Sequence, residues 1–331
     1  MAFRDVVGHR RLVRLLAQAI ARQSLTPSLI LSGPEGVGKR LIAVSIAQEL
    51  NCLKMDDSGA CGTCAACRRI ARGTHPDVMI IEPGESGSIK IEQVRAAIEQ
   101  AVFRPFEGRK RVTIIEPADA LVVAAENALL KTLEEPLPAS VFVLVTSRPD
   151  TLLPTVRSRC AHLRFGRLQV SEVATVLEGS QDYSNADALA AAAASDGSVR
   201  RALDLEADAF AEARSDAEDL LQVAGRDSRT RLDRAKELLK GSGTPASERE
   251  HLGARLMAMS ALIRDAGLVA SGADPRLLAN LDRTPVVESL ASTLGRDRLD
   301  RMFTAVADAE DALDRNVSPK VVADWLAINV H

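Results

Sequence analysis

A glycine-rich loop, GPEGVGKR at residues 33–40, stands between a short apolar run and a segment with helical periodicity. In this order of strand, tight turn and helix, a parallel α/β sheet presents consecutive backbone N–H groups to a phosphate. Gly33, Gly36 and Gly38 permit the turn. Lys39 has the length to reach terminal phosphates. The loop therefore predicts an α/β domain with a nucleotide-binding site.

Two positions depart from the pattern of a nucleotide-hydrolysing site. Arg40 stands where a serine or threonine hydroxyl would ligate Mg²⁺, and it has no oxygen to offer. Glu116 stands where a metal-binding carboxylate is expected, but Pro117 follows it in place of a residue that could polarise water. ATP and ADP are therefore candidate ligands of the loop. We expect Mg²⁺-assisted hydrolysis of ATP to be slow or absent. Glu116 and Asp119 can equally be a solvated strand end.

Apolar runs alternate with helical patterns over the first half of the chain. The runs dense in β-branched residues lie at 28–33, 77–83, 111–117 and 140–147, and helical patterns at 90–102 and 124–135 separate the last three. Buried strands that alternate with helices predict a parallel sheet with helices on both faces. We expect this α/β domain to cover residues 1–167.

Strand signals stop after LRFGRL (163–168), and alanine-rich helical segments follow. We expect a small helical lid domain at 168–205 and an all-α collar domain at 206–331. Segments of the collar place apolar residues at i, i+3 and i+4 spacing, as amphipathic bundle helices do, at 231–240, 251–267 and 299–315.

Composition and charge narrow the function classes. A net charge of -3 and an aromatic content of 3% give no overall attraction to DNA and few base-stacking side chains. No apolar run approaches the ~18–20 residues that cross a bilayer. The N-terminus lacks the basic-then-apolar order of a signal peptide. We expect a cytoplasmic protein that binds no membrane.

Four of the five cysteines, Cys52, Cys61, Cys64 and Cys67, are spaced as C-x8-C-x2-C-x2-C. This spacing suits four thiolates around a structural Zn²⁺, whose closed shell leaves no position for water. Disulfides are the weaker alternative in a cytoplasmic protein, and unligated cysteines in a surface loop are another. The stretch 52–67 has almost no large apolar residue, so it has little reason to order without a metal.

Five segments together resemble the bacterial clamp-loader family of AAA+ proteins: GPEGVGKR, the four cysteines, THPDV (74–78), ENALLKTLEEP (126–136) and RSRC (157–160). GSVRRAL (197–203) also resembles the second sensor element of that family. Within the family the chain is most similar to the delta-prime type of subunit of the DNA polymerase III holoenzyme. That type characteristically lacks the threonine and the Asp-Glu pair that gamma and tau motor subunits carry.

The resemblance implies roles for single residues. Arg159 would be an arginine finger that is supplied in trans to the nucleotide of a neighbouring subunit. Thr146 and Ser147 fall at the first sensor position and Arg200 at the second, where family members detect the γ-phosphate. The histidine and aspartate of THPDV are expected to form a fixed turn without a catalytic role.

The resemblance implies work in DNA replication. A delta-prime-like subunit would join gamma or tau motor subunits and a delta subunit in a five-subunit ring, which loads the sliding clamp onto primed DNA. Such a subunit is a component of a DNA-directed DNA polymerase holoenzyme, a nucleotidyltransferase. Nothing in the sequence resembles a polymerase active site, and we expect no intrinsic activity.

Two other functions stay open. An autonomous ATPase of the gamma type would hydrolyse ATP with Mg²⁺ when purified alone, against which Arg40 and Pro117 argue. A zinc-dependent DNA-binding module would use Arg68, Arg69 and Arg72 as a phosphate-binding patch, and its binding to duplex DNA would weaken with salt.

Overall fold

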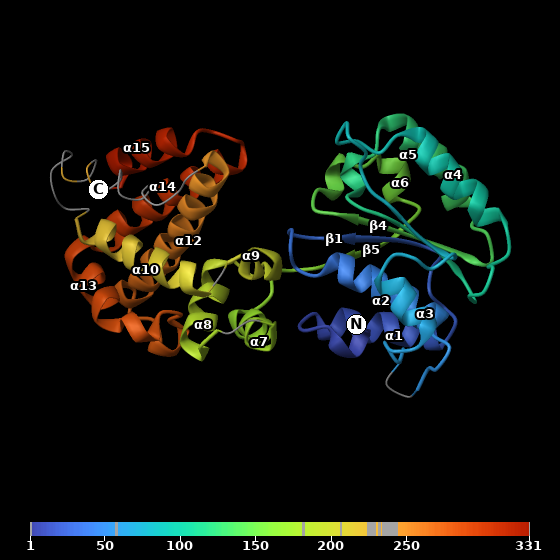
Figure 1. Cartoon of the computed structure of the whole chain (residues 1–331), viewed down its shortest axis with the longest axis horizontal. Helices are drawn as coiled ribbons and strands as arrows, with labels where there is room; N and C mark the ends of the chain where they lie inside the picture. Colours follow the sequence, from blue (N-terminus) through green and yellow to red (C-terminus); the bar gives the residue numbers. More distant parts are fainter. Residues whose placement is uncertain are drawn as a thin grey trace. The chain divides into compact units, whose positions relative to one another are not determined.

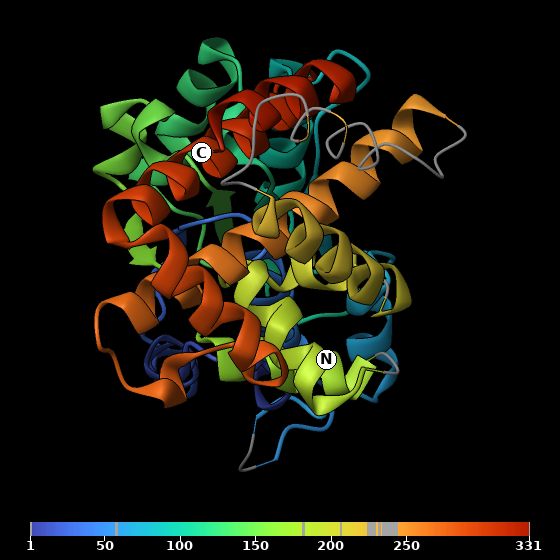
Figure 2. The same ribbon diagram turned by 90° about the vertical axis from the view of Figure 1, so that its left-hand side faces the viewer.

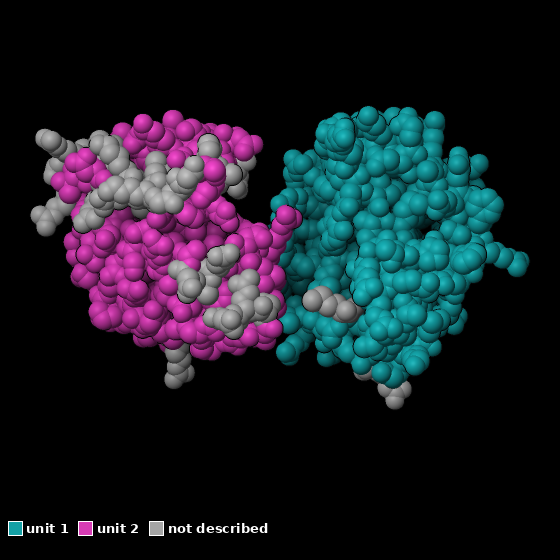
Figure 3. Space-filling view, in the orientation of Figure 1, with its two compact units in different colours: residues 1–168 teal, residues 169–331 magenta. Residues whose placement is uncertain are grey.

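The computed structural model divides the chain into two compact units, residues 1–168 and residues 169–331 (Figure 3). The structure describes residues 2–56, 59–180, 183–205, 207–223, 230, 233 and 244–330. The helix expected at 231–240 lies outside these residues apart from residue 233, and so do other parts of the expected collar. Each unit has its own core and is described by itself.

The first unit is built on a parallel five-stranded sheet with the order β2-β3-β4-β1-β5 (Figure 1). β1 lies inside the sheet, where Ser28 pairs with Phe142 of β4 and Leu29 pairs with Ala161 of β5. This arrangement confirms the expected fold class. The strands are β1 (Ser28–Ser32), β2 (Val78–Ile81), β3 (Arg111–Ile115), β4 (Ser140–Thr146) and β5 (Ala161–Arg164).

Helices cover both faces of this sheet, with α1, α2 and α3 on one face and α4, α5 and α6 on the other (Figure 1). They are α1 (Arg10–Ala21), α2 (Lys39–Asn51), α3 (Ala65–Ala71), α4 (Ile91–Val102), α5 (Val123–Glu134) and α6 (Pro154–Arg157). Short 3₁₀ turns occupy Phe3–Asp5, Ala118–Ala120 and Pro149–Thr151.

Alternation along the strands fills two separate cores. Leu29 and Leu31 of β1 pack into the core under α1 and α2, whereas Ile30 packs into the core under α4 and α5. All three side chains are buried. A strand buried on both faces reads as a continuous apolar run, which is why these strands are visible in the sequence.

The regular elements among the described residues of the second unit are all helices. Its long helix α12 packs against α10, α13 and α14 (Figure 2). The helices are α7 (Val170–Ser180), α8 (Asn185–Ala194), α9 (Val199–Leu203), α10 (Ala207–Gln222), α12 (Pro245–Ala270), α13 (Thr284–Leu294), α14 (Arg296–Asp314) and α15 (Pro319–Asn329), with 3₁₀ turns at Pro275–Leu277 and Leu281–Arg283. Among the described helices, none combines the length and apolar character that a membrane span requires.

Candidate functional site

The glycine-rich loop connects the end of β1 to the start of α2. Gly33, Gly36 and Gly38 have φ angles of 145, 74 and 94°, in the left-handed region that favours glycine. A Cβ atom on Gly33 would lie 2.1 Å from the carbonyl oxygen of Phe165. The loop therefore needs glycine both for its backbone angles and for its close approach to the chain that follows β5.

Lys39 is the first residue of α2 and lies inside this loop. Its Nζ atom donates hydrogen bonds to the carbonyl oxygens of Gly33 and Pro34, at 2.7 and 2.6 Å. Burial lowers the pKa of Lys39, although the carboxylates of Glu35, Glu116 and Asp119 oppose that shift. The ammonium group is thus held within the turn formed by the glycines.

Arg40 links the loop to the ends of two neighbouring strands. Its Nη1 atom contacts Glu82, which follows β2, and Oε2 of Glu116, which follows β3, the latter at 3.1 Å. The hydrogen bond to Glu82 raises the pKa of Arg40. Burial raises the pKa of Glu116, against the effect of Arg40. No pattern in the sequence singles out Glu82.

These side chains do not fit a Mg²⁺ ion. The cation requires oxygen ligands in near-octahedral geometry, and Arg40 provides none at the position of the usual hydroxyl. The carboxylate that would bind the metal, Glu116, is paired with the Arg40 guanidinium. Pro117 follows it without a group that can accept a proton.

The end of β4 faces the same loop. Thr146 donates a hydrogen bond from Oγ1 to Asp119 at 2.7 Å, and Arg148 pairs with Asp119 at 2.8 Å. Burial would raise the pKa of Asp119, but these two partners lower it. Ser147 donates from Oγ to Glu35 of the loop at 3.3 Å. The solvated strand end is wrong for Asp119, whose side chain is 5% exposed.

Arg159 lies beyond α6 at the surface of the first unit. Its Nε atom donates to Oε1 of Glu134 at 2.8 Å, its Nη2 atom contacts the same oxygen, and its Nη1 atom donates to the carbonyl oxygen of Thr155 at 3.0 Å. The side chain of Arg159 is 33% exposed. Glu134, the last residue of α5, therefore fixes the guanidinium plane, and spacing in the sequence could not reveal this pair.

Arg200 belongs to the second unit. It lies on α9 with its side chain 81% exposed, 3.9 Å from Asp204 one turn along. Its predicted part in sensing a γ-phosphate stays a prediction.

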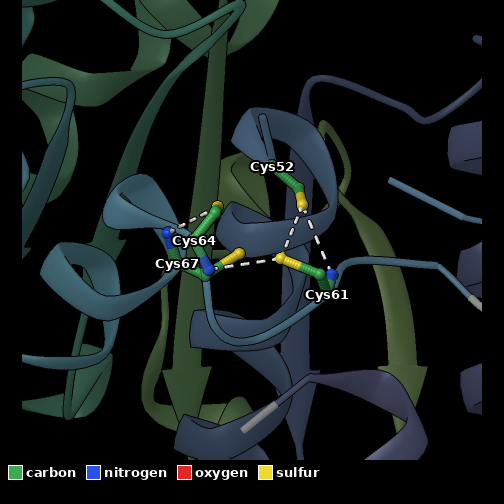
Figure 4. A group of neighbouring side chains, drawn as sticks. All are labelled: Cys52, Cys61, Cys64 and Cys67. Atoms are coloured by element: carbon green, nitrogen blue, oxygen red, sulfur yellow. Dashed lines mark hydrogen bonds between the residues drawn. The ribbon is translucent and has the colours of Figure 1, made fainter. Parts of the chain in front are cut away.

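The four cysteines converge at the far end of α2 (Figure 4). All four Sγ atoms lie within 4.8 Å of one another, and those of Cys52 and Cys61 are 3.6 Å apart. Four ligands at ~2.3 Å around a tetrahedral zinc would be separated by about 3.8 Å, which is similar. Backbone N–H groups of Thr63 and Cys64 lower the pKa of Cys61 to about 6, which favours a thiolate there.

The insertion that carries these cysteines has a core of alanine and cysteine only. That core comprises Ala2, Cys52, Ala60, Cys64, Ala66 and Cys67. Such small side chains bury little apolar area and therefore contribute little stability to the insertion. A metal ion such as zinc, held by the four thiolates, could stabilise it instead.

Polar contacts join this insertion to the rest of the unit. Gln48 donates to the carbonyl oxygen of Cys67 at 2.9 Å, and Glu49 accepts from the backbone N–H of Ala60 at 2.9 Å. Arg4 donates to the carbonyl oxygen of Ala60 at 2.6 Å. The position of the cysteines is therefore fixed by α2 and by the N-terminal turn.

The three arginines near the cysteines differ in their surroundings. Arg68 and Arg72 are exposed. Arg69 pairs with Glu107 at 2.7 Å. A phosphate-binding patch made of all three would therefore require Arg69 to leave its carboxylate.

His75 and Asp77 hold a turn, as the sequence predicted. Nδ1 of His75 accepts from the backbone N–H of Asp77 at 3.1 Å. Asp77 is buried and accepts from the backbone N–H groups of Phe106, Glu107 and Gly108. These bonds account for both side chains through local structure.

His9 is a residue near the loop that sequence reasoning missed. Its Nε2 atom lies 3.1 Å from the carbonyl oxygen of Val37, and its ring packs edge-to-face on Phe165 at 5.0 Å. It precedes α1 and has a φ angle of 49°. The sequence VGHRR, in which a histidine follows a glycine, could have indicated a turn before α1.

Comparison with known proteins finds that the first unit is similar to subunits of DNA polymerase III. A family model described as "DNA polymerase III, delta subunit" matches residues 8–169. The DNA polymerase III subunit delta' of Pseudomonas aeruginosa is 42% identical over 147 residues, which are 44% of this chain and 45% of that protein. The delta' subunit of Bacillus subtilis is 37% identical over 161 residues, 48% of each chain.

A subunit of the tau type is similar as well. The DNA polymerase III subunit tau of Bacillus subtilis is 31% identical over 230 residues, which are 67% of this chain and 40% of that protein. The chain thus spans less than half the length of these relatives. With its parallel sheet and its glycine-rich loop, the chain is thus similar over residues 8–169 to subunits of DNA polymerase III.

Proposed function

We propose that this chain acts as a delta-prime-like subunit of a DNA polymerase III clamp loader. It completes the ATP site of a neighbouring motor subunit with Arg159 and hydrolyses ATP poorly or not at all itself. The observation that carries this proposal is a contrast within the first unit. Its own loop pairs Arg40 with Glu116, while Arg159 stands at the surface in a supported conformation.

Arg159 has the properties that an arginine finger requires. A guanidinium is planar and always charged, and its donors match the oxygens of a transferring phosphate group. Glu134 and the carbonyl oxygen of Thr155 hold the group, which reduces the side-chain entropy that docking would cost. When a phosphate approaches, it competes with one carboxylate for these donors.

The chain's own chemistry is limited by two residues. Arg40 offers no hydroxyl to a metal, and Pro117 offers no base to a water molecule. ATP or ADP bound at the loop would then support assembly of the complex or stabilise a conformation of this chain. Gly33, Gly36, Gly38, Lys39, Glu116 and Thr146 form the proposed nucleotide site, to which Arg40 contributes a charge.

In this proposal Cys52, Cys61, Cys64 and Cys67 hold a structural Zn²⁺ ion. When bound, the ion would supply a tetrahedral cross-link between α2 and α3, and all four protein ligands would fill its shell. The insertion then needs no large apolar core of its own.

The proposed assembly is a five-subunit ring. Gamma or tau motor subunits and a delta subunit would flank this chain, and the ring would load the sliding clamp onto primer-template DNA. A small helical lid domain at 168–205 and a helical collar at 206–331, which joins the ring, complete the proposed organisation.

The test is reconstitution of the complex with motor and delta-type subunits, followed by the burst of phosphate release on primed DNA and clamp. Removal of an arginine finger lowers the rate at its site by ~10³-fold or more. Arg159→Ala should therefore lower the amplitude of this burst by the amount that the neighbouring ATP site contributes. The complex should still assemble in gel filtration.

Arg157→Ala provides a matched control, because Arg157 lies two positions away and pairs with Asp150 instead. It should leave the burst unchanged. A full burst with Arg159→Ala would refute the trans finger. ATP turnover by the purified chain alone, abolished by Lys39→Ala, would favour the autonomous ATPase.

A further inference from the structure

Arg40 takes both the place and the partner of a divalent cation. In a P-loop NTPase the residue after the lysine ligates Mg²⁺, and the ion also interacts with a carboxylate at the end of a neighbouring strand. Here Arg40 follows Lys39, and its Nη1 atom contacts carboxylates at the ends of β2 and β3, Glu82 and Glu116. A positive charge is therefore built into the chain at this point.

The guanidinium keeps donors for a further ligand. Nη1 makes both carboxylate contacts, which leaves the Nε and Nη2 donors without a partner among the described residues. The side chain of Arg40 is 48% exposed. A guanidinium with free N–H groups binds phosphate oxygens in a bidentate manner. Arg40 can thus contact carboxylates and a phosphate group at the same time, as a bridging metal does.

A metal ion would have to displace this arrangement. Mg²⁺ binds through carboxylates and phosphates and demands oxygen ligands at ~2.0–2.1 Å. Glu116 is paired with Arg40, and Lys39 adds a second positive charge nearby, whose pKa Glu116 influences. Separating Glu116 from Arg40 would leave a half-buried carboxylate and a new cation beside two others, which Coulomb repulsion opposes.

We propose that Arg40 is a resident cation that replaces Mg²⁺, so that the loop binds the metal-free di- or triphosphate of a nucleotide. Gly33, Gly36, Gly38 and Lys39 supply the cradle, and Arg40 supplies the charge that Mg²⁺ supplies elsewhere. This inference concerns the chain's own loop and does not depend on any role of Arg159.

Isothermal titration of the full chain with ADP and with ATP tests it. The nucleotides are stripped of metal on a chelating resin, because a soluble chelator would compete for ions at the cysteine cluster. The titration is repeated with added Mg²⁺. The wild-type dissociation constants should agree within about twofold in the two buffers, a difference of under half a kcal/mol.

Arg40→Thr introduces the hydroxyl that P-loops use and releases Glu116. In this variant Mg²⁺ should tighten nucleotide binding by about tenfold or more. Lys39→Ala should abolish binding in both buffers. Arg22→Thr, the same substitution at an exposed arginine after α1, should behave as the wild type and shows that the exchange itself is harmless.

Three outcomes would overturn the proposal. The first is that Mg²⁺ tightens nucleotide binding by the wild type by about tenfold. The second is that the wild type binds neither nucleotide in either buffer. The third is that Mg²⁺ leaves the dissociation constants of Arg40→Thr unchanged. None of them bears on the phosphate-release experiment with Arg159→Ala, so the two proposals fail separately.

Discussion

Asp77 shows how a single buried carboxylate organises a loop of the first unit. It accepts hydrogen bonds from three consecutive backbone N–H groups, those of Phe106, Glu107 and Gly108, at 2.6, 2.9 and 2.8 Å. Burial would raise its pKa, but these bonds and the charge of Arg111 lower it overall. The folded pKa therefore lies below the unfolded value of ~3.9. Its stabilisation is complete above the unfolded pKa and is lost as the pH falls through the folded pKa.

Asp77→Asn should lower the free energy of unfolding at pH ~7 by about 2–4 kcal/mol, since hydrogen bonds to a charged acceptor are worth ~1.5–3 kcal/mol each and the amide retains part of them. Urea denaturation followed by circular dichroism measures this difference. The difference from wild type should shrink as the pH approaches ~3, because the wild-type carboxylate then begins to protonate.

Asp150→Asn is the control for this prediction. The side chain of Asp150 is 91% exposed and pairs only with Arg157 among the described residues. Its substitution should change the free energy of unfolding by under about 0.5 kcal/mol. A penalty for Asp77→Asn that stays constant from neutral to acid pH would contradict the assigned role of the charge.

Local spacing in the sequence identified Arg40 and Arg159, but not their partners Glu82 and Glu134. Lys39 and Arg40 follow from the loop pattern, and Arg159 follows from RSRC. Glu82 and Glu134 lie 42 and 25 residues from their partners. Their proximity results from the strand order and from the packing of α5 on α6, which residue patterns do not encode.

Among the elements, α3 depends most directly on the cysteine cluster. Cys64 is its N-cap residue, and its Sγ atom accepts from the backbone N–H of Cys67 at 3.5 Å. The helix has seven residues, too few to be stable alone. A metal ion held by Cys64 and Cys67 would fix both the cap and the first turn.

Cys64→Ser separates capping from metal binding, because serine is a preferred N-cap residue but a poor zinc ligand. The zinc content of the purified chain, measured by mass spectrometry, should fall from about one ion per chain to near zero. Amide exchange over 60–71 should accelerate although the cap is preserved.

Cys160→Ser is the matched control. Cys160 is separate from the cluster and packs beside the core under α4 and α5. This variant should retain its zinc and the slow exchange over 60–71. Retention of zinc by Cys64→Ser, or unchanged exchange after zinc is lost, would speak against a metal that orders α3.

The sequence predicted the strands that form continuous apolar runs. β1, β3 and β4 are continuous apolar runs, because both of their faces are buried. β5 (Ala161–Arg164) was missed, since it lies at the sheet edge and alternates between half-buried and exposed residues. Its sequence AHLR carries no β-branched residue.

On the scale of the whole molecule, two units have separate cores. The first carries the loop and the cysteine cluster, and the second contains α7 to α15. Helices α12 and α14 lie where periodicity predicted them. The division of the second unit into a lid and a collar stays a prediction.

The single tryptophan, Trp325 on α15, gives a probe of the second unit alone. Removal of metal with a zinc chelator should lower the midpoint of the thermal transition of the first unit, followed by circular dichroism. The transition in Trp325 fluorescence should keep its midpoint, because domains with their own cores unfold as separate units.

The same thermal unfolding experiment on Cys64→Ser, with and without the chelator, distinguishes metal loss from other effects of the chelator. That variant should start at the lowered midpoint and show no further change. Equal displacement of both transitions in the wild type would mean that the two units unfold together.

Helix α2 begins at Lys39 in the glycine-rich loop and is followed directly by Cys52. Its 13 residues make a rod of about 20 Å, at ~1.5 Å per residue. Inserting one residue would swing either end by ~100° about the helix axis, so that Arg40 or Cys52 would point away from its partners. Related chains that keep both ends should therefore also keep the length of this helix.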